Sequence, residues 1–195
     1  MKTIKLLLAA TLIMVGVSLN AQDNQFTFGV KAGVNMSNMN GDVNGNKVRF
    51  GYNIGVTLDY AINQDWYILS GLQYTTKGMN GENKESLHAA YLQLPIHAGY
   101  KLEVTPATTL VFHAGPYLAY GINGDLSSKE EGVKISVSTF DFLKRFDAGL
   151  GLGVGAEFGK IALDLGWDFG LVNVLDKGEG SIRNGNAYLT VGYKF

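Results

Sequence analysis

Residues 146–158 read Phe-Asp-Ala-Gly-Leu-Gly-Leu-Gly-Val-Gly-Ala-Glu-Phe, and the pattern in this stretch runs through most of the chain. Every even position from Phe146 to Phe158 carries an apolar side chain, and every odd position between them carries glycine or an acidic residue. A period of two places successive side chains on opposite faces of a β-strand. The stretch is therefore predicted to be a strand with one apolar face and one polar face.

Seven further segments show the same alternation, and none carries a charged residue on its apolar face. The eight segments are 26–36, 49–60, 66–74, 90–102, 110–120, 146–158, 161–171 and 187–195. About ten residues is the length that a tilted strand needs to cross a bilayer. We predict an all-β fold, an eight-stranded antiparallel up-and-down transmembrane β-barrel that is closed so that no sheet edge faces lipid.

Aromatic residues and connection lengths give this barrel an orientation. Aromatic side chains gather at both ends of the apolar face, with Trp66 and Tyr193 at one rim and Tyr52 and Trp167 at the other, as in interfacial belts. The predicted connections alternate between long and short in the order 39–47, 61–65, 78–88, 103–108, 123–143, 159–160 and 173–186. We expect the long loops to be extracellular and the short turns, with both chain ends, to be periplasmic.

The first residues have the layout of a secretory signal peptide. Lys2 and Lys5 make a positive start, an apolar run follows over 6–17, and a small-residue exit ends at Ala21. We expect a cleaved signal peptide over 1–21 and an outer-membrane β-barrel domain over 22–195. The mature chain is thus expected to cross the inner membrane and to reside in the outer membrane.

Composition excludes several classes of function. Sixteen basic and seventeen acidic residues give a net charge of −1, so the chain lacks the basic surface of a nucleic-acid-binding protein. With no cysteine, it can form no disulfide, zinc–thiolate site or cysteine lipid anchor. We expect no cofactor.

Alternating glycines at positions 149 to 155 do not match a nucleotide-binding loop, because their spacing is strictly two and no helix follows. We expect them to thin one inner wall of the barrel, with Tyr67, Gln73 or Tyr91 from facing strands filling the space.

Charged residues on the polar face form a candidate cluster in the lumen. Arg49 and Lys77 lie at the extracellular ends of their strands, and Asp147 and Asp168 lie at the corresponding ends across the barrel. Opposite charges in a narrow lumen are expected to pair. We therefore expect a salt-bridge plug.

Two inward-facing histidines, His97 and His113, are expected nearly opposite one another on adjacent strands. Together with a carboxylate they could hold zinc, but two ligands do not make a site. A buried polar network is the favoured interpretation.

Two further motifs are weaker indications of a functional site. Asp42, Asn44 and Asn46 have the first spacings of a calcium loop, but the glycine and glutamate that such a loop requires are missing. Ser86 and His88, near Glu85, are the nearest approach to a hydrolase site, yet their spacing on one strand does not form a relay. We expect that the protein is not an enzyme.

Four short motifs carry a family resemblance. They are Tyr-Leu-Gln-Leu-Pro-Ile at 91–96, Ala-Gly-Pro-Tyr-Leu at 114–118, Phe-Asp-Ala-Gly at 146–149 and Val-Gly-Tyr-Lys-Phe at 191–195. In this order the chain resembles the PorT-like outer-membrane β-barrel family of Bacteroidota over essentially its whole mature length. The resemblance implies the fold and the location, and only weakly a function linked to protein secretion. The terminal Phe195 looks like the signal that the barrel-assembly machinery reads during biogenesis.

Eight strands leave an interior just wide enough for side chains to fill, so a general diffusion porin is disfavoured. The loops are then the expected working surface, and the segment 123–143 could offer strand edges to a protein partner. We favour a structural or interaction protein of the Gram-negative envelope, embedded in outer-membrane lipid. The alternatives are a narrow gated pore or a component of a secretion apparatus, and less favoured is an outer-membrane lipid hydrolase.

Overall fold

The computed structural model describes residues 25–42, 46–81, 86–130, 133–176 and 178–195. The predicted signal peptide at 1–21 lies outside them. The strands are β1 Phe26–Gly41, β2 Arg49–Ala61, β3 Trp66–Asn80, β4 Ser86–Thr105, β5 Thr108–Glu130, β6 Val133–Ser138, β7 Phe146–Phe158, β8 Ile161–Gly170 and β9 Ile182–Lys194. A short 3-10 helix, η1, spans Thr139–Asp141. Within the described ranges, no helix is both long and apolar enough to cross a membrane.

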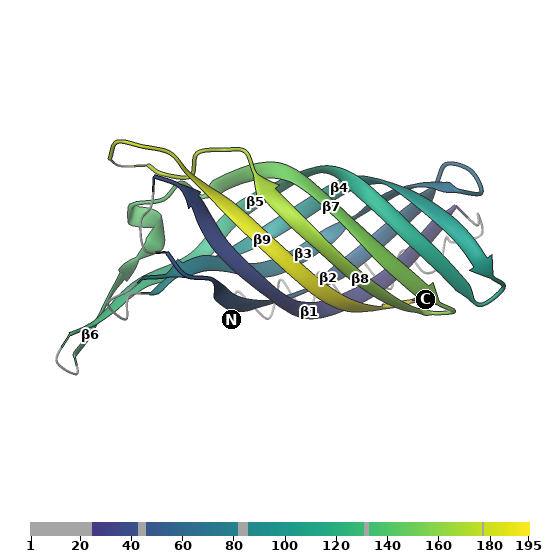
Figure 1. Cartoon of the computed structure of the whole chain (residues 1–195), viewed down its shortest axis with the longest axis horizontal. Helices are drawn as coiled ribbons and strands as arrows, with labels where there is room; N and C mark the ends of the chain where they lie inside the picture. Colours follow the sequence, from purple (N-terminus) through teal and green to yellow (C-terminus); the bar gives the residue numbers. More distant parts are fainter. Residues whose placement is uncertain (1–24, 43–45, 82–85, 131–132, 177) are drawn as a thin grey trace, which may run out of the picture.

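Eight of these strands close into a barrel, which confirms the predicted fold (Figure 1). Each strand pairs antiparallel with its neighbours, β1 pairs with β9, and the β4–β5 pairing completes the ring. The ninth strand, β6, pairs with the far end of β5. This β5–β6 hairpin projects beyond one end of the barrel (Figure 1).

Apolar side chains cover the outer surface of the ring. On β7, Leu150 and Leu152 are about half exposed, at 50% and 52%, whereas Asp147 on the opposite face of the same strand is fully buried. Exposed leucines are costly in water but favourable against lipid chains. The outer face is therefore the lipid face, and the charges lie in the lumen.

Aromatic pairs mark both rims of this face. Trp66 contacts Tyr100 with ring centroids 5.3 Å apart at the end where β1 begins and β9 ends, and Tyr52 stacks on Tyr74 at 5.9 Å near the other end. Such rings suit the headgroup region, where one part of the side chain is apolar and the other is hydrated.

Strands extend into two of the predicted loops. The segment 78–88 was expected to be a long connection, but β3 continues to Asn80 and β4 begins at Ser86. Within 123–143, β5 and β6 form a hairpin, which provides the strand edge expected of this segment. Backbone ladder hydrogen bonds do not depend on apolar side chains, so the strands continue past the point where the lipid-facing alternation ends.

The glycines of β7 do lie along an inner wall, but the residues over them differ from those expected. A Cβ on Gly149, Gly151 or Gly153 would lie within 2.8 Å of Tyr117, His97 or His113, respectively. These side chains come from β4 and β5, and not from Tyr67, Gln73 or Tyr91. The three rings can lie over β7 because its glycines have no side chains that would occupy the same space.

Replacing Gly153 with alanine is expected to destabilise the barrel by about 1–3 kcal/mol through overpacking. The new methyl would lie 2.5 Å from His113 Nε2 and 2.9 Å from the Leu165 carbonyl oxygen. Urea unfolding in lipid vesicles, followed by tryptophan fluorescence, measures the change.

The matched control is Gly192→Ala on the same lumen face, where the nearest atom to the new methyl is 3.3 Å away. Its stability should stay within about 0.5 kcal/mol of the wild type. Equal effects of the two substitutions would contradict the packing role of Gly153.

Candidate functional site

Polar side chains fill the lumen in three layers stacked along the barrel axis. We name them after the orientation predicted from the sequence: the extracellular layer, the central layer and the periplasmic layer. The alternation of each strand sends every second side chain inward, and the tilt of the strands brings residues distant in sequence to the same height.

The extracellular layer is built around one buried ion pair. Lys77 Nζ lies 3.2 Å from Asp147 Oδ2, and both side chains are fully buried. Asn184 Nδ2 also donates to Asp147, at 3.0 Å. The Lys77 ammonium lies 4.5 Å from the centroid of the Tyr117 ring. Each charge is thus compensated by a partner and by further polar or aromatic contacts, as a buried pair requires.

An apolar cluster covers this layer on the side of the η1 helix. Its fully or nearly fully buried members are Met39, Leu87, Leu143 and Val174. They come from the ends of β1 and β4 and from the segments that follow η1 and β8. Side chains from strands and loops therefore close this end of the lumen.

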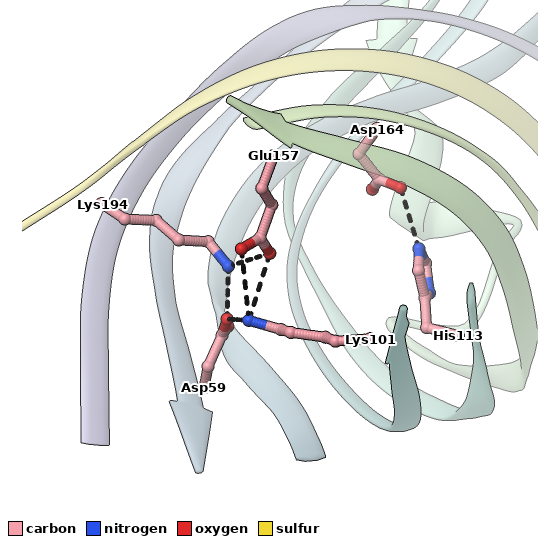
Figure 2. A network of polar contacts seen from close by, with 6 residues as sticks. All are labelled: Asp59, Lys101, His113, Glu157, Asp164 and Lys194. Atoms are coloured by element: carbon pink, nitrogen blue, oxygen red, sulfur yellow. Dashed lines mark hydrogen bonds and ion pairs between the residues drawn. The ribbon is translucent and has the colours of Figure 1, made fainter. Parts of the chain in front are cut away.

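The periplasmic layer is a square of two carboxylates and two ammonium groups from four strands (Figure 2). Lys101 Nζ lies 2.8 Å from Asp59 Oδ2 and 3.1 Å from Glu157 Oε1. Lys194 contacts the same two carboxylates. All four side chains are at most 16% exposed. Because each charge touches two of opposite sign, the square ties β2, β4, β7 and β9 together across the lumen.

The central layer contains the two histidines. His97 and His113 stack with centroids 5.1 Å apart, and their Nδ1 atoms are 2.9 Å from each other. His113 Nε2 lies 2.8 Å from Asp164 Oδ1 (Figure 2). Asp168 accepts from the amides of Gln93 and Asn186 at 2.9 Å and 3.3 Å.

A cavity of about 100 Å³ lies beside this layer. Lys31, His97, Asp164, Asp168 and Tyr188 are among the residues that line it.

The four residues predicted as one charge cluster are divided by the structure. Lys77 pairs with Asp147, whereas Asp168 lies in the central layer and accepts hydrogen bonds from neutral amides. Arg49 forms no ion pair within the described part of the chain, and its Nη1 is buried without a partner. Arg49 begins β2, as expected, but β3 continues past Lys77 to Asn80, so Lys77 lies further from the end of its strand than Arg49 does.

Sequence reasoning did not single out the periplasmic square. A signal for it does exist, because Asp59, Lys101, Glu157 and Lys194 all lie on the polar face near the periplasmic ends of their strands. Which charges meet depends on the stagger between strands, and that stagger is not visible within any one segment.

The weaker candidates also have definite positions. Ser86 Oγ donates to Asn80 Oδ1 at 3.0 Å, and His88 Nδ1 lies 3.3 Å from Asp125 Oδ1, so the serine and histidine have different partners. Among the described residues, no group of three histidine or acidic side chains is arranged to hold a metal. Glu85 and Asn44 lie outside the described residues.

Phe195 is 65% exposed at the end of β9, and its backbone N–H donates to the Phe28 carbonyl at 2.9 Å. Its use by the assembly machinery stays a prediction.

Comparison with known proteins gives matches to a family and to several solved structures. A family model described as an outer membrane protein beta-barrel domain matches residues 20–176. No curated protein sequence matches the chain.

Three solved structures illustrate the likeness in fold. Neisserial surface protein A has 16% identity and a TM-score of 0.52, with 86% of this chain and 97% of that chain covered. OprG of Pseudomonas aeruginosa has 12% identity and a TM-score of 0.51, covering 88% and 96%. A major outer membrane protein of Thermus thermophilus has 18% identity and a TM-score of 0.51, covering 87% and 99%. At these identities the likeness concerns the fold alone.

Replacing Asp59 with asparagine is expected to lower the unfolding free energy by about 3 kcal/mol, because two buried ammonium groups would then share one carboxylate. Urea unfolding of the refolded protein in vesicles measures the loss.

Glu103→Gln serves as the control, since Glu103 is an exposed carboxylate on β4, two residues beyond Lys101 of the square. It should change stability by no more than about 0.5 kcal/mol. If the two variants unfold alike, the square does not stabilise the barrel.

Proposed function

The chain belongs to the outer membrane protein β-barrel domain family, and from that membership we propose a structural or interaction role in the Gram-negative envelope, exerted through the extracellular loops. The single observation that carries the proposal is the filled lumen. A barrel whose interior is occupied at both ends offers its loops, rather than its interior, to other molecules.

The contacts within the lumen support this assignment. The square of Asp59, Lys101, Glu157 and Lys194 spans the periplasmic end, and the Lys77–Asp147 pair with its apolar cover closes the other. Opening a water-filled path would separate buried opposite charges, which costs several kcal/mol for each broken pair.

The β5–β6 hairpin is the strongest candidate for a working surface. β6 pairs with β5 from Asp125↔Ser138 to Glu130↔Val133, and it is the last strand in the sheet order. No further strand among the described residues pairs with its outer edge. An unpaired edge can accept an extended segment of another protein by β-augmentation.

A narrow gated pore is the second candidate, favoured by the cavity in the central layer. Rearrangement of the periplasmic square would connect this cavity to the periplasm. A role in a secretion apparatus is a third candidate and rests on the PorT-like motifs at 91–96 and 191–195.

In planar lipid bilayers the refolded protein is expected to show no steady single-channel conductance, because the buried ion pairs and the apolar cover block the lumen. An open porin added to the same bilayer is the positive control, and recovery of the protein from the membrane shows that it was inserted. Reproducible steady channels from the wild type would favour the gated pore instead.

A photo-crosslinking residue at Val137 in β6 is expected to capture a protein partner in native membranes. The control position is Val104 near the periplasmic turn, which is similarly exposed, at 56% against 43% for Val137. A defined adduct from Val137 alone would support the loop proposal and identify the partner. The same adduct from both positions, or none from either, would count against it.

A further inference from the structure

The three layers of the lumen differ in their balance of charge. In the periplasmic layer, Asp59 and Glu157 are matched by Lys101 and Lys194. In the extracellular layer, Lys77 matches Asp147.

The central layer holds Lys31 against two carboxylates, Asp164 and Asp168, all lining the same cavity. With both histidines neutral, this layer has one uncompensated negative charge. An unbalanced charge in a narrow, lipid-surrounded lumen is costly, so a positive charge is expected to bind there.

The histidine dyad, His97 and His113, has three positions that can carry a hydrogen atom, two of them inside hydrogen bonds. One lies between His113 Nε2 and Asp164 Oδ1, which are 2.8 Å apart. A second lies between the two Nδ1 atoms at 2.9 Å. The third is His97 Nε2, a buried atom with no hydrogen-bond partner, although the residue is only 4% exposed.

His97 Nε2 and the Asp168 carboxylate both border the space above Gly151. A methyl group on Gly151 would lie 2.7 Å from His97 Nε2 and 3.0 Å from Asp168 Oδ1. At His97 Nε2, the nearby negative charge of Asp168 disfavours a bare nitrogen lone pair and favours an N–H.

Two neutral imidazoles carry two N–H groups, which leaves one of the three positions without a hydrogen. A dyad with one added proton carries three. We propose that the His97–His113 dyad is a proton-binding site that holds one added proton at neutral and mildly alkaline pH and so balances the charge of the central layer. His113 is then the imidazolium, donating to Asp164 and to His97 Nδ1, and His97 is neutral with its proton on Nε2.

The groups that contact the dyad or line the cavity beside it are Lys31 on β1, Asp59 on β2, Gln73 on β3, Gln93 on β4, Gly151, Gly153 and Glu157 on β7, Asp164 and Asp168 on β8, and Tyr188 and Lys194 on β9. Lys31 lies between Gly55 and Gly192 and forms no ion pair within the described part of the chain. Asp59 is already engaged by two lysines of the periplasmic layer.

The test is nitrogen NMR of the full-length barrel in lipid nanodiscs with ¹⁵N-labelled histidine. At about pH 8 a free imidazole is protonated in only roughly 3% of molecules. The expected result at that pH is one histidine protonated on both ring nitrogens and a second protonated on Nε2 alone. His88, near Asp125 outside the central layer, is the internal reference.

Two variants shift the balance in opposite directions. Asp168→Asn removes the excess negative charge, so the dyad should be neutral at about pH 8. Lys31→Met removes the matching positive charge, so it should raise the pH at which the dyad loses its added proton. Asp125→Asn is the matched control and should alter only His88. Heat-modifiable migration in gels verifies that each variant folds.

Four outcomes would overturn the proposal. They are two neutral histidines in the wild type at about pH 8, an imidazolium that persists in Asp168→Asn, equal shifts in the two variants, and a dyad whose proton is displaced by added sodium, potassium or ammonium ions. The last would mean that a cation in the cavity, and not a proton, balances the layer.

A second readout is stability. A proton bound more tightly by the folded chain stabilises it at low pH, and this contribution is lost as the pH rises through the titration of the folded dyad. The thermal midpoint of the wild type should therefore fall more steeply above neutral pH than that of Asp168→Asn. Parallel pH profiles would contradict a bound proton.

Discussion

The fold depends on one constraint, which is that a lipid bilayer offers no hydrogen-bond partners to the polypeptide backbone. Every N–H and C=O group at membrane depth must bond within the protein. The β4–β5 and β1–β9 pairings meet this demand by closing the sheet into a ring. Closure in turn determines the faces of each strand, because an outward side chain must tolerate lipid and an inward one must fit a narrow lumen. The alternation along β7 satisfies both requirements in thirteen residues.

The lumen of an eight-stranded ring has too little room for large side chains from every strand, so large side chains on some strands lie against small residues on others. The glycines of β7 make space for Tyr117, His97 and His113. The same narrowness brings ionisable groups within a few ångströms of one another, where an unpaired charge would be expensive. The periplasmic square and the Lys77–Asp147 pair follow from that crowding. Packing and electrostatics in the lumen are therefore consequences of the same closure.

The sequence was sufficient for the architecture but not for the contacts inside it. Period-two alternation is a property of each segment alone, so the eight barrel strands and the closed ring were predicted correctly. Contacts between strands depend on stagger, which no single segment contains. Lys77 and Asp147 were both nominated, yet Arg49 was wrongly grouped with them, and the periplasmic square was missed. β3 and β4 also extend into the segment 78–88, beyond the residues that alternate between apolar and polar. They do so because backbone hydrogen bonding between the strands continues where the side-chain alternation stops.

Different parts of the barrel are constrained to different degrees. Its outer wall needs only apolar side chains of suitable size, so many sequences satisfy it, and structures that share this fold have identities of 12% to 18% to the chain. The lumen is more restrictive, because a change in one charge alters the balance of a whole layer. The β5–β6 hairpin projects beyond the barrel, where water can satisfy the backbone groups of its outer edge (Figure 1). Loop sequences can therefore change with a binding partner while the wall and lumen keep the barrel intact, and for this reason the fold determines where the protein resides more strongly than what it binds.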